Sequence, residues 1–82
     1  MKTIVLTVAA ARQFDALPAE ARSAIADALH AYALTGSGDV KRLIGRDAYR
    51  MRVGRYRVIF EEDAVTVLAL YVGKRDENTY RR

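Results

Sequence analysis

The chain has 82 residues, of which 51% are hydrophobic and 29% charged, with a formal net charge of +4, as expected for one small globular domain. It contains no cysteine, which excludes a disulfide framework and a thiolate metal site and agrees with a reducing cytoplasm. No segment approaches the roughly 18 apolar residues that cross a bilayer, so we expect a single cytoplasmic domain over residues 1–82 with no membrane partner.

The N-terminal part predicts a strand followed by a short helix. Residues 3–8 are rich in β-branched side chains, which favour a strand. Residues 9–16 predict a helix whose packing face follows helical spacing. That face comprises Ala10, Phe14 and Leu17.

A longer helix is expected over residues 19–34. Pro18 precedes it and suits a helix start, and Glu20 places a negative charge in the first turn. The packing face recurs at helical spacing and comprises Ala21, Ile25, Ala28, Leu29 and Tyr32. Residues 35–39, with two glycines, predict the loop that ends this helix.

The rest of the chain reads as strands. Residues 40–44 predict a short strand, residues 48–60 a hairpin, and residues 65–72 a strand without strict alternation, which is typical of a strand covered on both faces. Residues 73–82 are expected to form a charged tail. The predicted fold class is α+β: an N-terminal strand, a two-helix hairpin and a mainly antiparallel sheet of three to four strands.

The hairpin is the most informative segment, because its arginines fall at a fixed parity. With Gly54 and Arg55 as a two-residue turn, Val53 faces Tyr56, Arg52 faces Arg57, and Arg50 faces Ile59. One face then carries an apolar set: Tyr49, Met51, Val53, Tyr56, Val58 and Phe60. The other face carries Arg50, Arg52 and Arg57. Like charges directly opposite each other cost stability, so this cluster favours an anionic partner.

Charge distribution supports the same reading. Residues 1–39 carry three basic and four acidic side chains, whereas residues 40–57 carry seven basic side chains against Asp47 alone. Such a concentration attracts a polyanion and makes its binding salt-dependent. A solvated basic surface is the alternative interpretation.

The sequence shows no motif for a histidine-activated nucleophile or a metal site. The one histidine, His30, lies on the outer side of the long helix, so neither a histidine-activated nucleophile nor a histidine metal site is expected. We therefore expect no metal and no cofactor. Arginine forks match phosphate oxygens, and RNA carries its own nucleophile in the 2′-hydroxyl. Tyr80 could transfer a proton or stack on a base, or could be a packing residue.

The segment 45–60, followed by Val72-Gly73-Lys74-Arg75 and Tyr80, resembles the RelE/ParE superfamily of bacterial type II toxins. The likeness extends over the whole chain in element order and size. In the RelE branch it implies a toxin that enters the ribosomal A site and cuts mRNA by 2′-hydroxyl attack. The products would be a 2′,3′-cyclic phosphate and a 5′-hydroxyl. It also implies a cognate antitoxin, whose acidic segment would cover the arginine face and wrap the helices.

The resemblance also assigns the catalytic residues. The matching positions are Arg50, Arg52, Arg57, Arg75 and Tyr80. Lysines are frequent in the RelE branch at two of these positions, where this chain has Arg50 and Arg52, which cannot give up a proton. The general base would then be Tyr80, Glu77 or no residue at all. Two other functions remain open: a ParE-like inhibitor of DNA gyrase without nuclease activity, and a non-catalytic RNA-binding module.

Overall fold

The structure, a computed structural model, describes residues 1–74 and contains two helices and five strands in that part of the chain. The elements are β1 (Thr3–Leu6), α1 (Val8–Asp15), α2 (Ala19–Thr35), β2 (Val40–Arg42), β3 (Tyr49–Val53), β4 (Tyr56–Glu62) and β5 (Thr66–Lys74). Neither described helix is long and apolar enough to cross a membrane.

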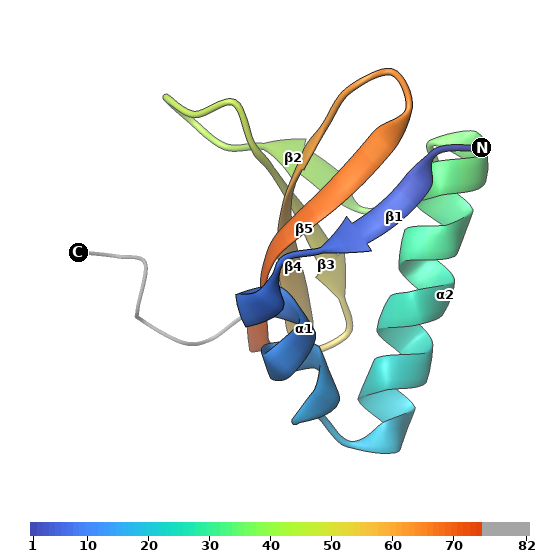
Figure 1. The fold of residues 1–82 in the computed structure, drawn as a ribbon, viewed down its shortest axis with the longest axis vertical. Helices are drawn as coiled ribbons and strands as arrows, with labels where there is room; N and C mark the ends of the chain where they lie inside the picture. Colours follow the sequence, from blue (N-terminus) through green and yellow to red (C-terminus); the bar gives the residue numbers. More distant parts are fainter. Residues whose placement is uncertain (75–82) are drawn as a thin grey trace.

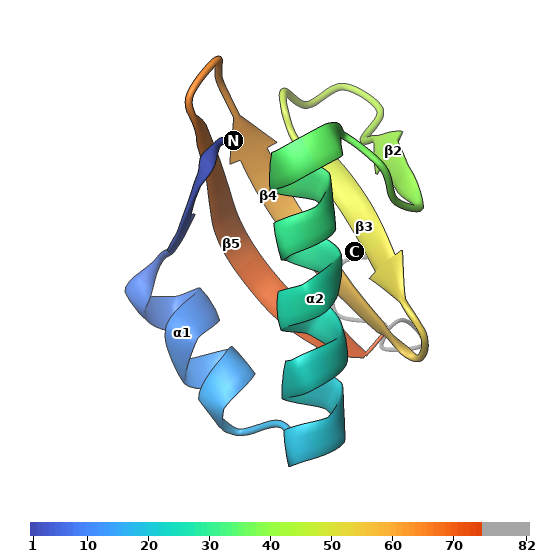
Figure 2. The ribbon, with the colours of Figure 1, turned by 90° about the vertical axis from the view of Figure 1, so that its right-hand side faces the viewer.

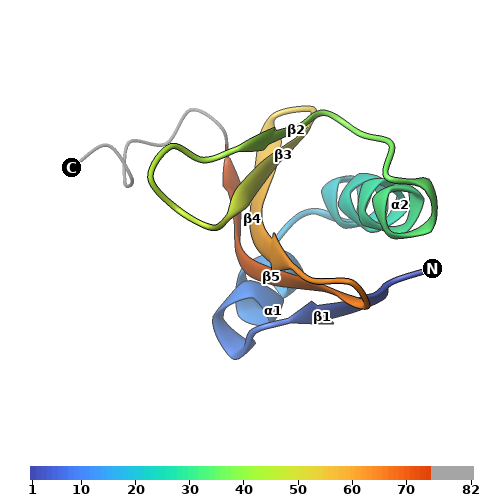
Figure 3. The ribbon, with the colours of Figure 1, turned by 90° about the horizontal axis from the view of Figure 1, so that it is seen from above.

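The five strands form one sheet in the order β1-β5-β4-β3-β2, and all neighbours are antiparallel except β1 and β5 (Figure 1). The α+β class is confirmed, but three to four strands is too few. The fifth strand is β1. It is the first element of the chain and pairs in parallel with β5, the last strand. Helix α2 lies across one face of the sheet with α1 beside it, whereas the opposite face of β3 and β4 is covered by neither helix (Figures 2 and 3).

Both helices lie within one residue of the predicted ranges, and Val8, predicted as the last residue of the first strand, is the first residue of α1. Thr7 caps α1 by accepting a hydrogen bond from the amide of Ala10 at 3.1 Å. Helix α2 starts after Pro18 and ends at Gly36, whose φ of 78° is the left-handed conformation that glycine adopts without strain. The predicted helical faces pack against the sheet. The core is therefore a single layer between the two helices and the sheet.

The predicted hairpin register is confirmed at every pair. Val53 lies opposite Tyr56, Arg52 opposite Arg57, and Arg50 opposite Ile59. The inner face is apolar as expected: Met51, Val58 and Phe60 are buried, and their neighbours on that face pack against them. Phe60 stacks on Tyr49 and meets Tyr32 of α2 edge-on, with ring centroids 5.5 and 5.2 Å apart. Because the inner face must be apolar, the arginines occupy the outer one.

Strand β5 differs from the expectation of a strand covered on both faces. Its register with β4 shifts between Ile59, which pairs with Tyr71, and Phe60, which pairs with Ala69. Leu70 is thus the extra residue of a β-bulge, and a bulge breaks the alternation of side chains. The helices cover only the inner residues of β5, which are Val67, Ala69 and Val72. The irregular pattern therefore marked a bulge.

The C-terminal ends of β2 and β5 also differ from the prediction. Strand β2 stops at Arg42, before the predicted residue 44, because the amide of Leu43 donates to the carbonyl of Ala48 and closes a loop. Strand β5 runs on through Gly73 and Lys74, which had been assigned to the tail. This extension gives Arg57 a partner on β5, namely Gly73.

Candidate functional site

Two rows of side chains cross the outer face of the sheet. The first row joins Lys41 of β2, Arg50 of β3, Ile59 of β4 and Tyr71 of β5 as successive Cα partners. The second row joins Arg52, Arg57 and Gly73. Arg50, Arg52 and Arg57 are thus brought together as predicted, and we call these three residues the arginine face.

The three arginines differ in exposure. Arg52 is exposed and Arg50 is half-buried, whereas Arg57 is only 3% exposed. The guanidinium carbon of Arg57 lies 5.8 Å from the centroid of the Tyr71 ring, a distance at which the face of an aromatic ring attracts a cation. Arg57 is accordingly a fixed charge within the sheet surface, while Arg52 and Arg50 are the more accessible ones.

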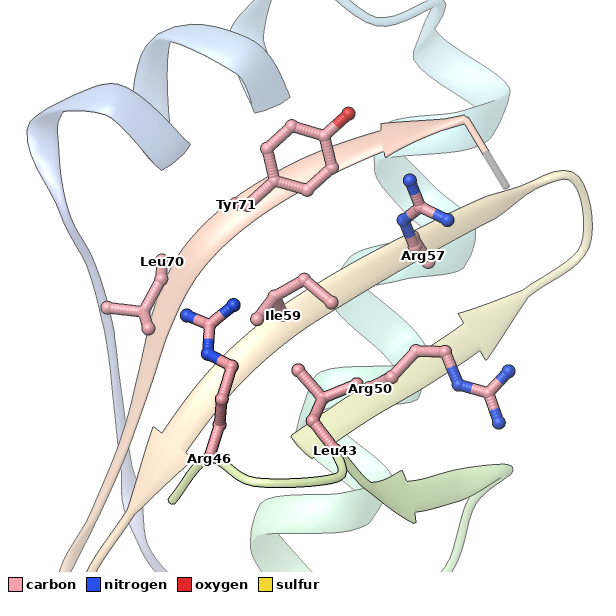
Figure 4. A pocket seen from close by; sticks show the side chains of 7 residues that line it. All are labelled: Leu43, Arg46, Arg50, Arg57, Ile59, Leu70 and Tyr71. Atoms are coloured by element: carbon pink, nitrogen blue, oxygen red, sulfur yellow. The ribbon is translucent and has the colours of Figure 1, made fainter. Parts of the chain in front are cut away.

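Beside the arginine face lies a hollow of about 380 Å³, within the size range of small-molecule sites. Its lining consists of Leu43, Arg46, Arg50, Arg57, Ile59, Leu70 and Tyr71. In Figure 4 the guanidinium groups of Arg46 and Arg57 lie on either side of Ile59, and that of Arg50 points away from it. The hollow therefore has an apolar floor and a cationic rim.

Tyr71 was not predicted as a site residue, and its position depends on two features of β5. The bulge at Leu70 turns Tyr71 onto the outer face, opposite Ile59. A β-carbon on Gly73 would lie 2.6 Å from Cζ of the Tyr71 ring, closer than any real contact, so only glycine leaves room for the ring. The break in alternation along residues 65–72 was the one sequence signal that could have indicated this tyrosine.

Arg46 and Lys41 were also missed as individual site residues, although both lie in the basic segment. Arg46 belongs to the loop between β2 and β3, where strand parity predicts nothing, and Lys41 lies on the short edge strand β2. Two predicted residues, Arg75 and Tyr80, lie outside the described residues, as does Glu77. Their roles stay predictions.

Two acidic side chains within residues 1–74, Asp47 and Glu62, are engaged away from the arginine face. Asp47 accepts a hydrogen bond from Arg42 at 2.8 Å in the loop that follows β2. Glu62 accepts hydrogen bonds from Lys2 and Tyr32, both at 2.7 Å, and so joins β4 to the start of the chain and to α2. Within residues 1–74, no group of three histidine, cysteine or acidic side chains is placed to hold a metal ion.

Within residues 1–74, a large change in pKa belongs to the hydrogen-bonded group of Lys2, Tyr32 and Glu62. Burial, the hydrogen bond to Glu62 and the charge of Glu62 together raise the pKa of Tyr32 to about 12. Burial alone would raise the pKa of Glu62, but the hydrogen bonds from Lys2 and Tyr32 outweigh it and lower that pKa. Both shifts are consequences of packing rather than of a catalytic site.

The arginine face can bind phosphate oxygens and stabilise negative charge that develops on them. Its arginines cannot transfer a proton, because a guanidinium stays protonated in proteins. The first row on the outer face also contains Lys41 and Tyr71, whose side chains each carry a proton that can be transferred. The described part of the site is thus better suited to binding and electrostatic stabilisation than to acid–base chemistry.

Comparison with protein-family models and with curated protein sequences gives no match. Solved structures do match over nearly the whole chain. The E. coli RelBE toxin–antitoxin complex aligns with a TM-score of 0.79 and 18% identity, covering 94% of this chain and 100% of that one. The Mycobacterium tuberculosis RelBE2 complex aligns at 0.72 and 24% identity, covering 90% and 98%.

A YoeB/ParE toxin from Agrobacterium tumefaciens aligns with a TM-score of 0.74 and 15% identity, covering 92% of this chain and 99% of that one. At sequence identities this low, the structural similarity establishes the fold alone. The predicted resemblance to the RelE/ParE superfamily is therefore confirmed at the level of architecture.

Proposed function

We propose that this chain, which has the fold of the RelE/ParE superfamily toxins, is the toxin of a toxin–antitoxin pair that cleaves mRNA on the ribosome. The observation that carries the proposal is the arginine face, where Arg50, Arg52 and Arg57 occupy neighbouring positions of one sheet surface. The attack would come from the RNA 2′-hydroxyl, so the protein would need no nucleophile, metal or cofactor of its own. The reaction would yield a 2′,3′-cyclic phosphate and a 5′-hydroxyl.

The arginine face suits the electrostatic part of this reaction. Guanidinium groups fix two phosphate oxygens at once, and preorganised charges stabilise the extra negative charge of the pentacoordinate phosphorane. Arg57 would act as the fixed charge, because its burial and the Tyr71 ring hold it in place. Arg50 and Arg52 would contact the phosphate from the open side of the sheet.

The tail would complete the site. By the resemblance, Arg75 would add a further positive charge and Tyr80 would transfer a proton or stack on a base. Since arginine cannot serve as the general base, proton transfer falls to Tyr80 or Glu77, or needs no residue of the protein. Catalysis here would depend more on charge stabilisation than in relatives with lysines at positions 50 and 52.

An antitoxin is the proposed protein partner. Several of the similar structures are toxin–antitoxin complexes. The basic outer face would attract an acidic antitoxin segment. On the helical side Val8 and Leu34 are 70% and 57% exposed, and these apolar side chains would be covered where the antitoxin wraps the helices.

The test is cleavage of a reporter mRNA by the purified chain in a translation extract. We expect cleavage by the wild type, and a loss of about 100-fold or more in rate for Arg50→Gln combined with Arg52→Gln. Arg12→Gln is the matched control, because Arg12 is an exposed arginine on α1. Equal cleavage by the wild type and the double variant would remove the arginine face from the mechanism.

Inhibition of DNA gyrase is the second candidate function, favoured by the similarity to the YoeB/ParE structure. It predicts inhibition of gyrase supercoiling by the wild type and intact mRNA in the extract. Our proposal predicts the reverse. A chain that binds RNA without cutting it and without affecting gyrase would instead be a non-catalytic RNA-binding module.

A further inference from the structure

The hollow beside the arginine face has features that phosphate binding alone does not require. Its floor is apolar, formed by the half-buried side chains of Ile59 and Leu70, and one wall is the aromatic ring of Tyr71. A phosphate gains nothing from an apolar floor. An aromatic wall above apolar side chains, with charged groups at the rim, matches a ligand that is flat and apolar on its faces and anionic at one end.

The backbone is adapted to hold Tyr71 in this place. The bulge in β5 brings Leu70 and Tyr71 to the same side of the sheet, and Gly73 leaves the space that the Tyr71 ring occupies. The ring lies within 6 Å of the guanidinium of Arg57, which belongs to the arginine face. A base against this ring would therefore have its own phosphate next to the arginines.

We propose that the hollow is a nucleobase subsite of the RNA substrate, with Tyr71 as the stacking surface. This inference rests on the proposed function, and it adds a residue that the resemblance does not assign. A base stacks on the Tyr71 ring above Ile59 and Leu70, and its adjoining phosphate lies next to the arginine face, close to the charge of Arg57. Arg46 lies at the opposite rim and offers N–H donors to acceptors on the base edge (Figure 4).

The subsite is testable without the ribosome, by comparing two probes. Nucleoside 3′-monophosphates and inorganic phosphate are titrated separately into the isotopically labelled full chain, and methyl and amide NMR signals are followed. We expect the nucleotides to bind roughly 5- to 100-fold more tightly than phosphate, the range that one base stacked on an aromatic ring contributes. The signals of Ile59 and Leu70 should shift with nucleotides and not with phosphate.

Two variants separate stacking from folding. In Tyr71→Ala the ratio of nucleotide affinity to phosphate affinity should fall to about one, and phosphate binding that persists in this variant shows that the arginine face has folded. Tyr71→Phe retains the ring and should keep the nucleotide preference. Equal binding of nucleotide and phosphate by the wild type, or a preference that survives in Tyr71→Ala, would overturn the subsite.

The two proposals fail separately. Cleavage of reporter mRNA by a wild type that shows no nucleotide preference would remove the subsite and leave the nuclease function standing. If the chain shows a Tyr71-dependent nucleotide preference but leaves the reporter mRNA intact, the nuclease function is removed and the nucleobase subsite is retained. In the cleavage assay itself, Tyr71→Ala should alter the preference for the base beside the cut, because that base has lost its stacking surface.

Discussion

The ring of Tyr71 lies over the α-carbon of Gly73, two residues further along β5, in space that any other residue at position 73 would fill with its β-carbon. Gly73 is also the Cα partner of Arg57 on the neighbouring strand. One glycine thus allows an aromatic ring and a buried guanidinium to share the surface of the sheet. The conformation of this site depends on the absence of a side chain.

Replacing Gly73 by alanine should move Tyr71 without removing it. The ring is the end of a flexible side chain, so it can rotate away, and we expect the free energy of unfolding to change by less than about 1 kcal/mol. The nucleotide preference in the NMR titration should fall as far as it does in Tyr71→Ala. An unchanged preference in Gly73→Ala, with the ring still in place, would contradict the steric relationship.

Arg52 and Arg57 lie directly opposite each other on β3 and β4, and this pair should cost stability. We expect Arg52→Gln to raise the free energy of unfolding by about 0.2–1 kcal/mol, because it removes a like-charge pair. The same variant should bind single-stranded RNA more weakly, with a salt dependence reduced by about 0.7 in slope. Urea unfolding and fluorescence titrations at several salt concentrations measure the two effects.

Arg12→Gln on α1 is the control for both measurements, since it removes one exposed arginine away from the arginine face. It should leave the slope of the salt dependence nearly unchanged. A less stable Arg52→Gln, or equal effects of the two variants on RNA binding, would contradict a repulsive and functional arginine pair.

The hydrogen bond from the Tyr32 hydroxyl to Glu62 joins α2 to β4 and should stabilise the fold. Tyr32→Phe keeps the ring, and with it the edge contact to Phe60, but removes this hydrogen bond. We expect the free energy of unfolding to fall by about 1–2 kcal/mol, since the partner is charged but partly exposed. Urea denaturation at neutral pH measures the loss.

The same pair predicts how stability depends on pH. Folding raises the pKa of Tyr32 from 10.0 to about 12, so its contribution is complete below pH 10 and is lost as the pH rises towards 12. Folding lowers the pKa of Glu62 below 4.5, so its contribution is present above that pH and is lost as the pH falls further. The stability difference between wild type and Tyr32→Phe should therefore be constant between these limits and shrink beyond both.

Gln13 of α1 takes the place of a missing strand beside β5. Strand β1 ends at Leu6, opposite Ala69, and beyond that point the amide of Val72 donates to Oε1 of Gln13 at 2.9 Å. Gln13→Ala should cost about 1–2 kcal/mol and accelerate hydrogen exchange at the Val72 amide. Gln13→Glu keeps an acceptor and should retain slow exchange, whereas equal exchange in both variants would contradict this role.

Much of the fold could be predicted because it is encoded locally. Helical spacing fixed the packing faces of α1 and α2, and the period of two on either side of Gly54 fixed the hairpin register. The pairing of β1 with β5 could not be derived in this way, because it joins residues about 63 positions apart in a parallel register that no turn specifies. The count of strands was wrong for that reason.

The candidate site likewise has a part that local sequence patterns predict and a part that they do not. Strand parity was sufficient to gather Arg50, Arg52 and Arg57 on one face. The burial of Arg57 depends on its surroundings on the sheet, among them Tyr71, whose position follows from a bulge between two strands. Arg46 lies in a loop without periodicity. Such features arise from tertiary packing and leave at most a break in a local pattern.

The central claim is cleavage of mRNA by its own 2′-hydroxyl on the ribosome, and the chemistry of the RNA ends tests it most directly. The purified chain is added to ribosomes carrying a defined mRNA, and the ends of each fragment are identified by enzymatic labelling and mass spectrometry. We predict a 2′,3′-cyclic phosphate on the upstream fragment and a 5′-hydroxyl on the downstream one, both absent with Arg50→Gln and Arg52→Gln combined. Intact mRNA, or fragments with a 5′-phosphate and a 3′-hydroxyl, would contradict the claim.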